Sequence, residues 1–70
     1  MKTEQEINQM IKHFEEDAND KEETAERQNM YNDMVKALRT VVNSNEQEIN
    51  DLISKCNNQA MINALKMVIE

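Results

Sequence analysis

Apolar residues recur along the chain at intervals of three and four, the spacing that places side chains on one face of an α-helix. In the first stretch this stripe consists of Ile7, Met10, Ile11, Phe14 and Ala18. Thr3 followed by Glu6 has the spacing of a capping box, in which each side chain binds a free backbone N–H group. The pattern predicts a first helix over about residues 3–18.

A second apolar stripe predicts a helix over about residues 21–42. Its members are Met30, Tyr31, Met34, Val35, Leu38, Val41 and Val42. Asp20 and Glu23 repeat the capping-box spacing at its start. Between residues 21 and 29 only Ala25 is apolar, so we expect the first turns of this helix to be exposed or frayed.

The segment 43–45 (Asn-Ser-Asn) is the strongest break, because asparagine tolerates the conformation that ends a helix where glycine is absent. Either Ser44 with Gln47 or Asn45 with Glu48 can cap the helix that follows, predicted over about residues 45–69. Three consecutive amide residues, 57–59, lie inside it. They form either an exposed face or polar layer, or a kink or polar lining for a ligand.

These elements predict an all-α, single-domain protein over residues 1–70, with a short N-terminal helix laid across an antiparallel hairpin of the second and third helices. The C-terminal end is apolar on nearly every side. We expect it to form an oligomer interface, with a dimer as the default, unless the first helix covers that face. The expected interface residues are Met61, Ile62, Leu65, Val68 and Ile69.

The amino-acid composition excludes several structural and functional classes of protein. Glycine, proline and tryptophan are absent, and Phe14 and Tyr31 are the only aromatic residues, which excludes glycine-rich phosphate loops and base-stacking sheets. A single cysteine, Cys56, cannot form an internal disulfide and lies on the apolar stripe, so we interpret it as a core residue in a reducing, cytoplasmic compartment. No apolar run is long enough to span a membrane, and we expect no membrane association.

The charge is concentrated in one part of the chain. The net charge is −6, and residues 1–26 carry all of that excess, since acidic and basic residues balance over 27–70. The densest acidic positions are Glu15, Glu16, Asp17, Asp20, Glu22, Glu23 and Glu26. They form either a solvated surface or a surface for a basic partner. No basic stripe exists, so direct nucleic-acid binding is not expected.

No arrangement of residues indicates an enzyme, a cofactor or a metal. His13 is the only histidine, and with Glu16 and Asp17 it makes at most a weak metal corner. The series Asp17, Asn19, Lys21 resembles the start of a calcium loop but lacks the glycine and the final glutamate. We therefore expect a non-enzymatic binding protein.

Four residues of the second helix are candidates for binding a small anionic ligand. Arg27 precedes Tyr31 by four residues, so a guanidinium and an aromatic ring can lie together and hold a phosphate or stack on a base. Lys36 and Arg39 add positive charge further along the helix. The alternative is that Tyr31 belongs to the core and Arg27 is a solvated charge.

In size and layout the chain resembles the phage anti-CBASS sponges, small helical proteins that self-assemble and sequester cyclic nucleotide signals of bacterial immunity. The matching residues are Phe14, the stripe Met30, Met34, Leu38 and Val41, and the run 59–64 (Gln-Ala-Met-Ile-Asn-Ala). Where that family has a Tyr-His-Pro-Pro-like stretch, this chain has Glu-Glu-Asp-Ala at 15–18, and carboxylates repel phosphate. The resemblance implies an oligomeric sponge for a cyclic nucleotide, acting in the host cytoplasm.

Two functional hypotheses follow from the sequence. In the first, the protein is an anti-defence sponge whose ligand contacts are Arg27, Tyr31, Lys36 and Arg39. In the second, it is an acidic inhibitor, of the anti-CRISPR or DNA-mimic type, that covers a basic nucleic-acid-binding surface of a host defence protein.

Overall fold

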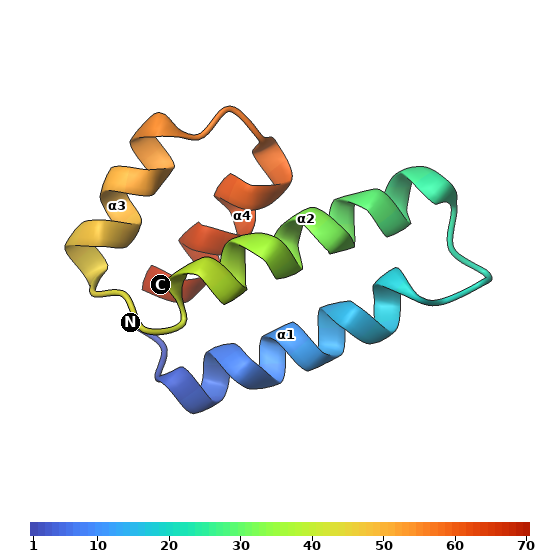
Figure 1. Ribbon diagram of the computed structural model, residues 1–70, viewed down its shortest axis with the longest axis horizontal. Coiled ribbons are helices and arrows are strands. Elements are labelled where there is room, and N and C mark those ends of the chain that lie inside the picture. The colour runs from blue at the N-terminus through green and yellow to red at the C-terminus, as the bar shows by residue number, and fades with distance from the viewer.

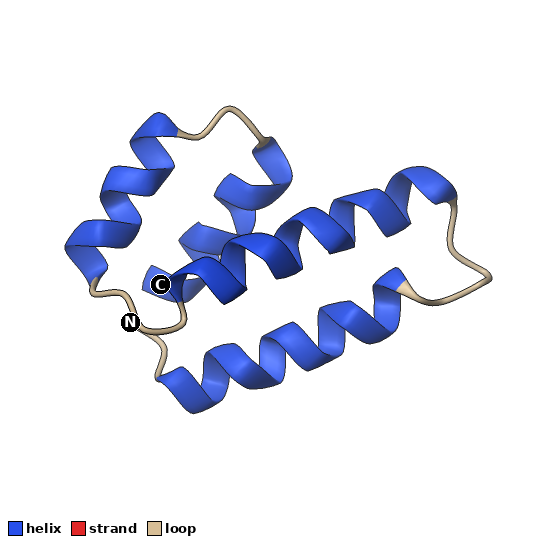
Figure 2. Ribbon diagram, viewed as in Figure 1, coloured by secondary structure: helices blue, strands red, loops and turns tan.

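The computed structural model describes all residues from 1 to 70 and contains four helices and no strands (Figures 1 and 2). The helices are α1 (Glu4–Ala18), α2 (Ala25–Val41), α3 (Glu46–Lys55) and α4 (Gln59–Ile69). The predicted all-α fold is thus confirmed. None of the four helices has both the length and the apolar character needed to cross a membrane.

The arrangement of the helices differs from the predicted one. α1 and α2 run antiparallel side by side and form the long hairpin, while α4 crosses α2 on its other side (Figure 1). α3 is a short connecting helix that packs mainly against α4. Periodicity shows which face of a helix is apolar but not which helix covers it. α2 packs against α1 and also against α4, the C-terminal part of the predicted third helix, so the predicted arrangement is not confirmed as a whole.

The helix starts are set by side chains that bind free backbone N–H groups. The predicted capping box of Thr3 and Glu6 is confirmed at α1, and of the two alternatives at α3 the structure has Asn45 with Glu48. α2 does not start near residue 21. Its N-cap is Thr24, whose hydroxyl accepts the N–H of Arg27 at 3.2 Å.

The predicted single helix over 45–69 is also wrong, because the chain leaves the helical conformation at residues 56–58. Cys56 has extended backbone angles, and Asn58 is the N-cap of α4. The Asn58 side chain accepts the N–H of Met61 at 3.1 Å and donates to Asp33 of α2 at 3.0 Å. The three amides therefore mark a turn that redirects the chain toward α2.

All four helices contribute to one core. Its five most deeply buried large side chains are Ile7, Leu38, Val41, Ile49 and Val68. Removing each of them from water stabilises the fold by roughly 1.5–3 kcal/mol. Phe14 and Tyr31, which are partly buried, pack against this core from α1 and α2, with ring centroids 6.0 Å apart.

The two ends of the chain are joined. The backbone N–H of Lys2 donates to the Val68 carbonyl at 2.8 Å, and the Lys2 ammonium donates to the Met67 carbonyl at 2.6 Å. Both carbonyls lie in the last turn of α4, where the backbone carries partial negative charge. The N-terminal segment thus caps the C-terminal helix.

Candidate functional site: the acidic end of the helical hairpin

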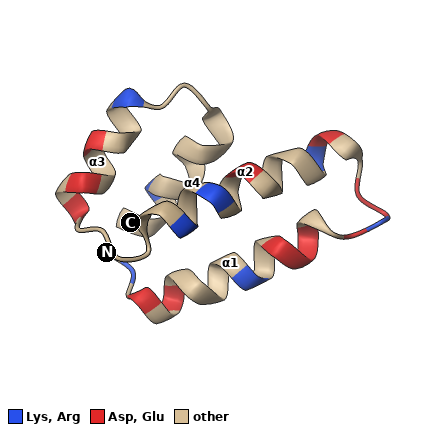
Figure 3. Cartoon of the chain, in the orientation of Figure 1, with Lys and Arg blue, Asp and Glu red and all other residues tan.

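The dense acidic positions predicted from the sequence gather at one end of the molecule. This acidic end consists of the last turn of α1, the loop 19–24 and the first turn of α2 (Figure 3). Its carboxylates are Glu15, Glu16, Asp17, Asp20, Glu22, Glu23 and Glu26. Of these, the four with no ion-pair partner, all exposed, are Glu16, Asp20, Glu22 and Glu26.

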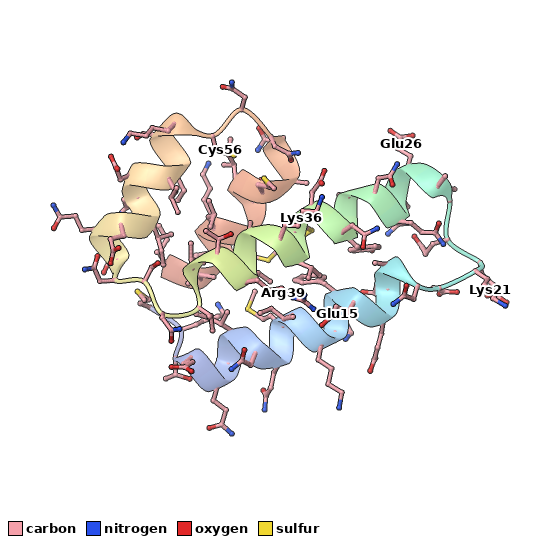
Figure 4. The ribbon with its side chains drawn as sticks, viewed as in Figure 1. Glu15, Lys21, Glu26, Lys36, Arg39 and Cys56 are labelled. Atoms are coloured by element: carbon pink, nitrogen blue, oxygen red, sulfur yellow. The ribbon has the colours of Figure 1, made fainter.

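Local hydrogen bonds hold the loop of the acidic end. The Asp20 carboxylate accepts the N–H of Glu22 at 2.9 Å, and the Asp20 carbonyl accepts the side-chain amide of Gln28 from α2. The use of the Asp20 side chain in this turn explains why it does not cap α2. Lys21 lies at the tip of the loop, whereas Glu26 projects from α2 on another side (Figure 4).

The acidic residues of α1 oppose the electrostatics of their own helix. Glu15, Glu16 and Asp17 occupy its last turns, and no basic residue is present in the last turn. The C-terminus of a helix carries partial negative charge, so each carboxylate there costs about 0.3–1 kcal/mol where it is uncompensated. Glu15 is compensated by Arg39, and Asp17 has only His13, with the Nε2 and Oδ2 atoms 3.7 Å apart. Stability of the fold therefore does not explain Glu16.

Arg27 and Tyr31 lie together, as their spacing predicts. Arg27 Nη2 donates to the Tyr31 hydroxyl at 3.0 Å, and the guanidinium carbon is 5.9 Å from the ring centroid. The guanidinium also forms an ion pair, since Arg27 Nε lies 3.0 Å from Glu23 Oε2. The hydrogen bond to Tyr31, and then the charge of Glu23, raise the pKa of Arg27, which stays charged.

Lys36 and Arg39 lie on a different face of α2 and do not join Arg27 and Tyr31. They line a polar groove between α1 and α2 with a volume of about 730 Å³. Asn19, Asn29 and Asn32 also line it. The Arg39 guanidinium donates to Glu15 at 2.7 Å (Figure 4), whereas Lys36 forms no ion pair. The four predicted ligand contacts thus divide into two separate pairs.

The residues of the predicted oligomer interface are divided between core and surface. Leu65 and Val68 are buried within the chain's own fold. Met61, Ile62 and Ile69 are only partly buried and remain partly accessible. The first helix does not account for this burial, because α4 packs mainly against α2 and α3. Self-association through α4 stays a prediction that rests on those three residues.

An apolar groove that the sequence did not indicate lies beside α3. We call it the α3 groove; it has a volume of about 260 Å³. Its lining residues are Ala37, Thr40, Leu52, Lys55, Cys56, Met61 and Leu65. Cys56, expected in the core, is half-buried at its rim with a free thiol. The groove forms where the chain turns at 56–58. The three consecutive amides at 57–59 were the only feature of the sequence that indicated this turn.

The His13 corner brings together too few ligands for a metal ion. No group of three or more histidine, cysteine, aspartate or glutamate side chains is close enough to hold one. Glu16 lies on the same face of α1 but forms no ion pair with His13.

Comparison with protein-family models, with curated proteins and with solved structures finds no match for this chain. The resemblance to the anti-CBASS sponges stays a prediction that rests on the residues quoted for it.

Proposed function

We propose that this protein is a non-enzymatic binding protein whose acidic end covers a basic, nucleic-acid-binding surface of another protein. The observation that carries the proposal is that four exposed carboxylates at one end of the α1–α2 hairpin have no ion-pair partner. They are those of Glu16, Asp20, Glu22 and Glu26. Concentrated charge of one sign steers association with a surface of the opposite sign.

Rigidity supports this proposal as much as charge does. The Asp20 turn, its bond to Gln28 and the Glu23–Arg27 pair fix the loop between the two helices. A surface that is ordered before binding loses less conformational entropy when it binds.

The test is binding to a panel of purified DNA- and RNA-binding proteins, measured by biolayer interferometry at low and high salt. We expect one or more of them to bind with a Kd that rises steeply with salt, and duplex DNA to compete. The triple variant Glu16→Gln, Glu22→Gln, Glu26→Gln should weaken binding by about tenfold or more, mainly through slower association.

The matched control is the triple variant Glu4→Gln, Glu46→Gln, Glu70→Gln. It removes the same net charge from exposed, unpaired carboxylates outside the acidic end. Equal weakening by the two triple variants would mean that only net charge matters and would contradict the proposal. Undiminished binding by the first variant would contradict it as well.

The polar groove supports a second candidate, a site for a cyclic nucleotide. Lys36 is a free cation there, and the side chains of Asn19, Asn29 and Asn32 offer amide donors and acceptors that base edges and phosphates use. Arg39 becomes available to a phosphate only if it leaves Glu15. Because a phosphate would have to displace Glu15 from Arg39, we rank the cyclic-nucleotide site below the acidic end.

Thermal unfolding with a panel of cyclic di- and trinucleotides tests the second candidate. A ligand that binds only the folded chain must raise the Tm, and one present at about 100 times its Kd stabilises by about 2.7 kcal/mol. We expect the rise to disappear in Lys36→Gln if the groove binds the nucleotide, and in Arg27→Ala if the Arg27–Tyr31 pair does. An unchanged Tm with every nucleotide would remove this candidate.

A further inference from the structure

α3 has the least buried side-chain surface of the four helices. Of its residues only Ile49 is buried, Ile53 is partly buried, and all the others are exposed. Each of the other three helices has at least three buried residues. α3 also lies at the outer edge of the molecule, between two connecting segments (Figure 1). Separating α3 from the rest of the fold therefore exposes less apolar surface than separating any other helix.

No polar contact joins α3 to another helix. The side chains of Asn45 and Glu48 bind each other's backbone N–H groups in the capping box. Ser54 donates to the Asp51 carbonyl, and Lys55 forms an ion pair with the Asp51 carboxylate at 3.0 Å. No backbone hydrogen bond links α3 to another helix either. α3 is thus held against the rest of the protein by apolar contact alone.

The other three helices are joined by polar contacts as well as by the core. Arg39 of α2 binds Glu15 of α1 at 2.7 Å, and Asn58, the N-cap of α4, donates to Asp33 of α2 at 3.0 Å. Lys2, which precedes α1, donates to two carbonyls in the last turn of α4. None of these contacts involves α3, so α1, α2 and α4 can stay together when α3 moves.

The segments on either side of α3 are suited to be hinges. Residues 42–45 and 56–58 are not helical, and a few residues of this kind can absorb the rotation that moves a helix. α3 contributes Leu52 and Lys55 to the lining of the α3 groove, and α2 and α4 contribute most of the rest. Movement of α3 away from α2 and α4 would therefore widen the groove and expose its apolar lining.

We propose that α3 is a lid, which opens and closes as a unit about residues 42–45 and 56–58 while α1, α2 and α4 remain folded. Each opening exposes the apolar surface that α2 and α4 contribute to the α3 groove. Elements with few buried apolar contacts are those that open locally in folded proteins. The inference is independent of the proposed function, because the acidic end belongs to the α1–α2 hairpin (Figure 3).

Native-state hydrogen exchange, followed by NMR for each backbone amide, tests the lid. Relative to the rates of an unstructured chain, we expect the amides of α3 to exchange about tenfold or more faster than the slowest amides of α1, α2 and α4. Low concentrations of urea should change the exchange of α3 little, because opening the lid exposes only a small part of the surface that complete unfolding exposes.

A matched pair of variants separates opening of the lid from unfolding of the whole chain. Ile49→Val in α3 and Ile11→Val in α1 each remove one methyl group from a buried isoleucine. Ile49→Val should speed exchange at all amides of α3 by a common factor of about threefold or more. Ile11→Val should speed the slowest amides of α1 and α2 by about the same factor but leave those of α3 within about 1.5-fold, because α1 stays folded when the lid opens.

Two results would overturn the proposal. If the amides of α3 respond to Ile11→Val as strongly as those of α2, or exchange as slowly as those of α2 in the natural chain, α3 opens only when the whole protein unfolds. If Ile49→Val speeds only the amides at the ends of α3, the helix frays residue by residue and does not open as a unit. Circular dichroism checks that both variants are folded.

Discussion

At the first turn of α1, the Glu6 carboxylate accepts the backbone N–H of Thr3 at 3.0 Å, while the Thr3 hydroxyl accepts the N–H of Glu6 at 3.2 Å. The hydrogen bond from the Thr3 backbone N–H, and after it the interaction of the carboxylate with the Thr3 side chain, lower the pKa of Glu6 from its ordinary value of 4.5. A carboxyl whose pKa is lower in the folded chain stabilises the fold above its unfolded-state pKa. That contribution is lost as the pH falls through the folded-state value.

Glu6→Gln should therefore make the free energy of unfolding less dependent on pH in the acidic range. Glutamine can still bind the Thr3 N–H but does not titrate, so the variant lacks the loss of stability that the natural chain suffers as the pH falls below 4.5. Urea unfolding at neutral pH and at a series of acidic pH values measures the difference. Glu4→Gln, in the same turn but without a side-chain hydrogen bond, is the control, and an identical pH dependence of the two variants would refute the explanation.

At the scale of elements, the decisive feature is the turn between α3 and α4. The turn at 56–58 gives α3 and α4 different directions and places α4 across α2, where Ala64, Leu65 and Val68 are buried. Asn58 fixes the turn through two contacts, one to the start of α4 and one to Asp33 of α2.

Asn58→Ala should lower the free energy of unfolding by about 1–2 kcal/mol, because α4 loses its N-cap and Asp33 loses its donor. Asn57→Ala is the matched control, since Asn57 is exposed and its side chain forms no hydrogen bond; its effect should stay within about 0.5 kcal/mol. Chemical denaturation of both variants measures the two changes. Equal costs at 57 and 58 would mean that the turn is fixed in another way.

At the scale of the whole molecule, charge and apolar surface are separated along an elongated body of 37 × 26 × 17 Å. The unpaired carboxylates lie at one end, and α3 with its apolar groove lies at the other (Figures 1 and 3). The bonds from Lys2 to the last turn of α4 join the chain ends near α3 and leave the acidic end free.

Much of the local structure could be predicted from the sequence. The apolar spacing predicts the helical class. The cap of α1 was predicted and the cap of α3 was one of two alternatives, because Thr3 with Glu6 and Asn45 with Glu48 act over three residues. The acidic end was also visible in the sequence, since its residues are close together along the chain. The start of α2 was missed because the Asp20 side chain binds within its own turn, which left Thr24 to cap the helix.

Contacts between residues far apart in the sequence could be identified only from the tertiary structure. Helical periodicity by itself determined the all-α class and which faces are apolar, because it depends on neighbours within one turn. The folding of α4 onto α2 and the α3 groove depend on how helices cross and where the chain turns. Those features arise from packing between elements, in which an apolar face accepts any complementary partner, so the one-dimensional pattern does not specify them.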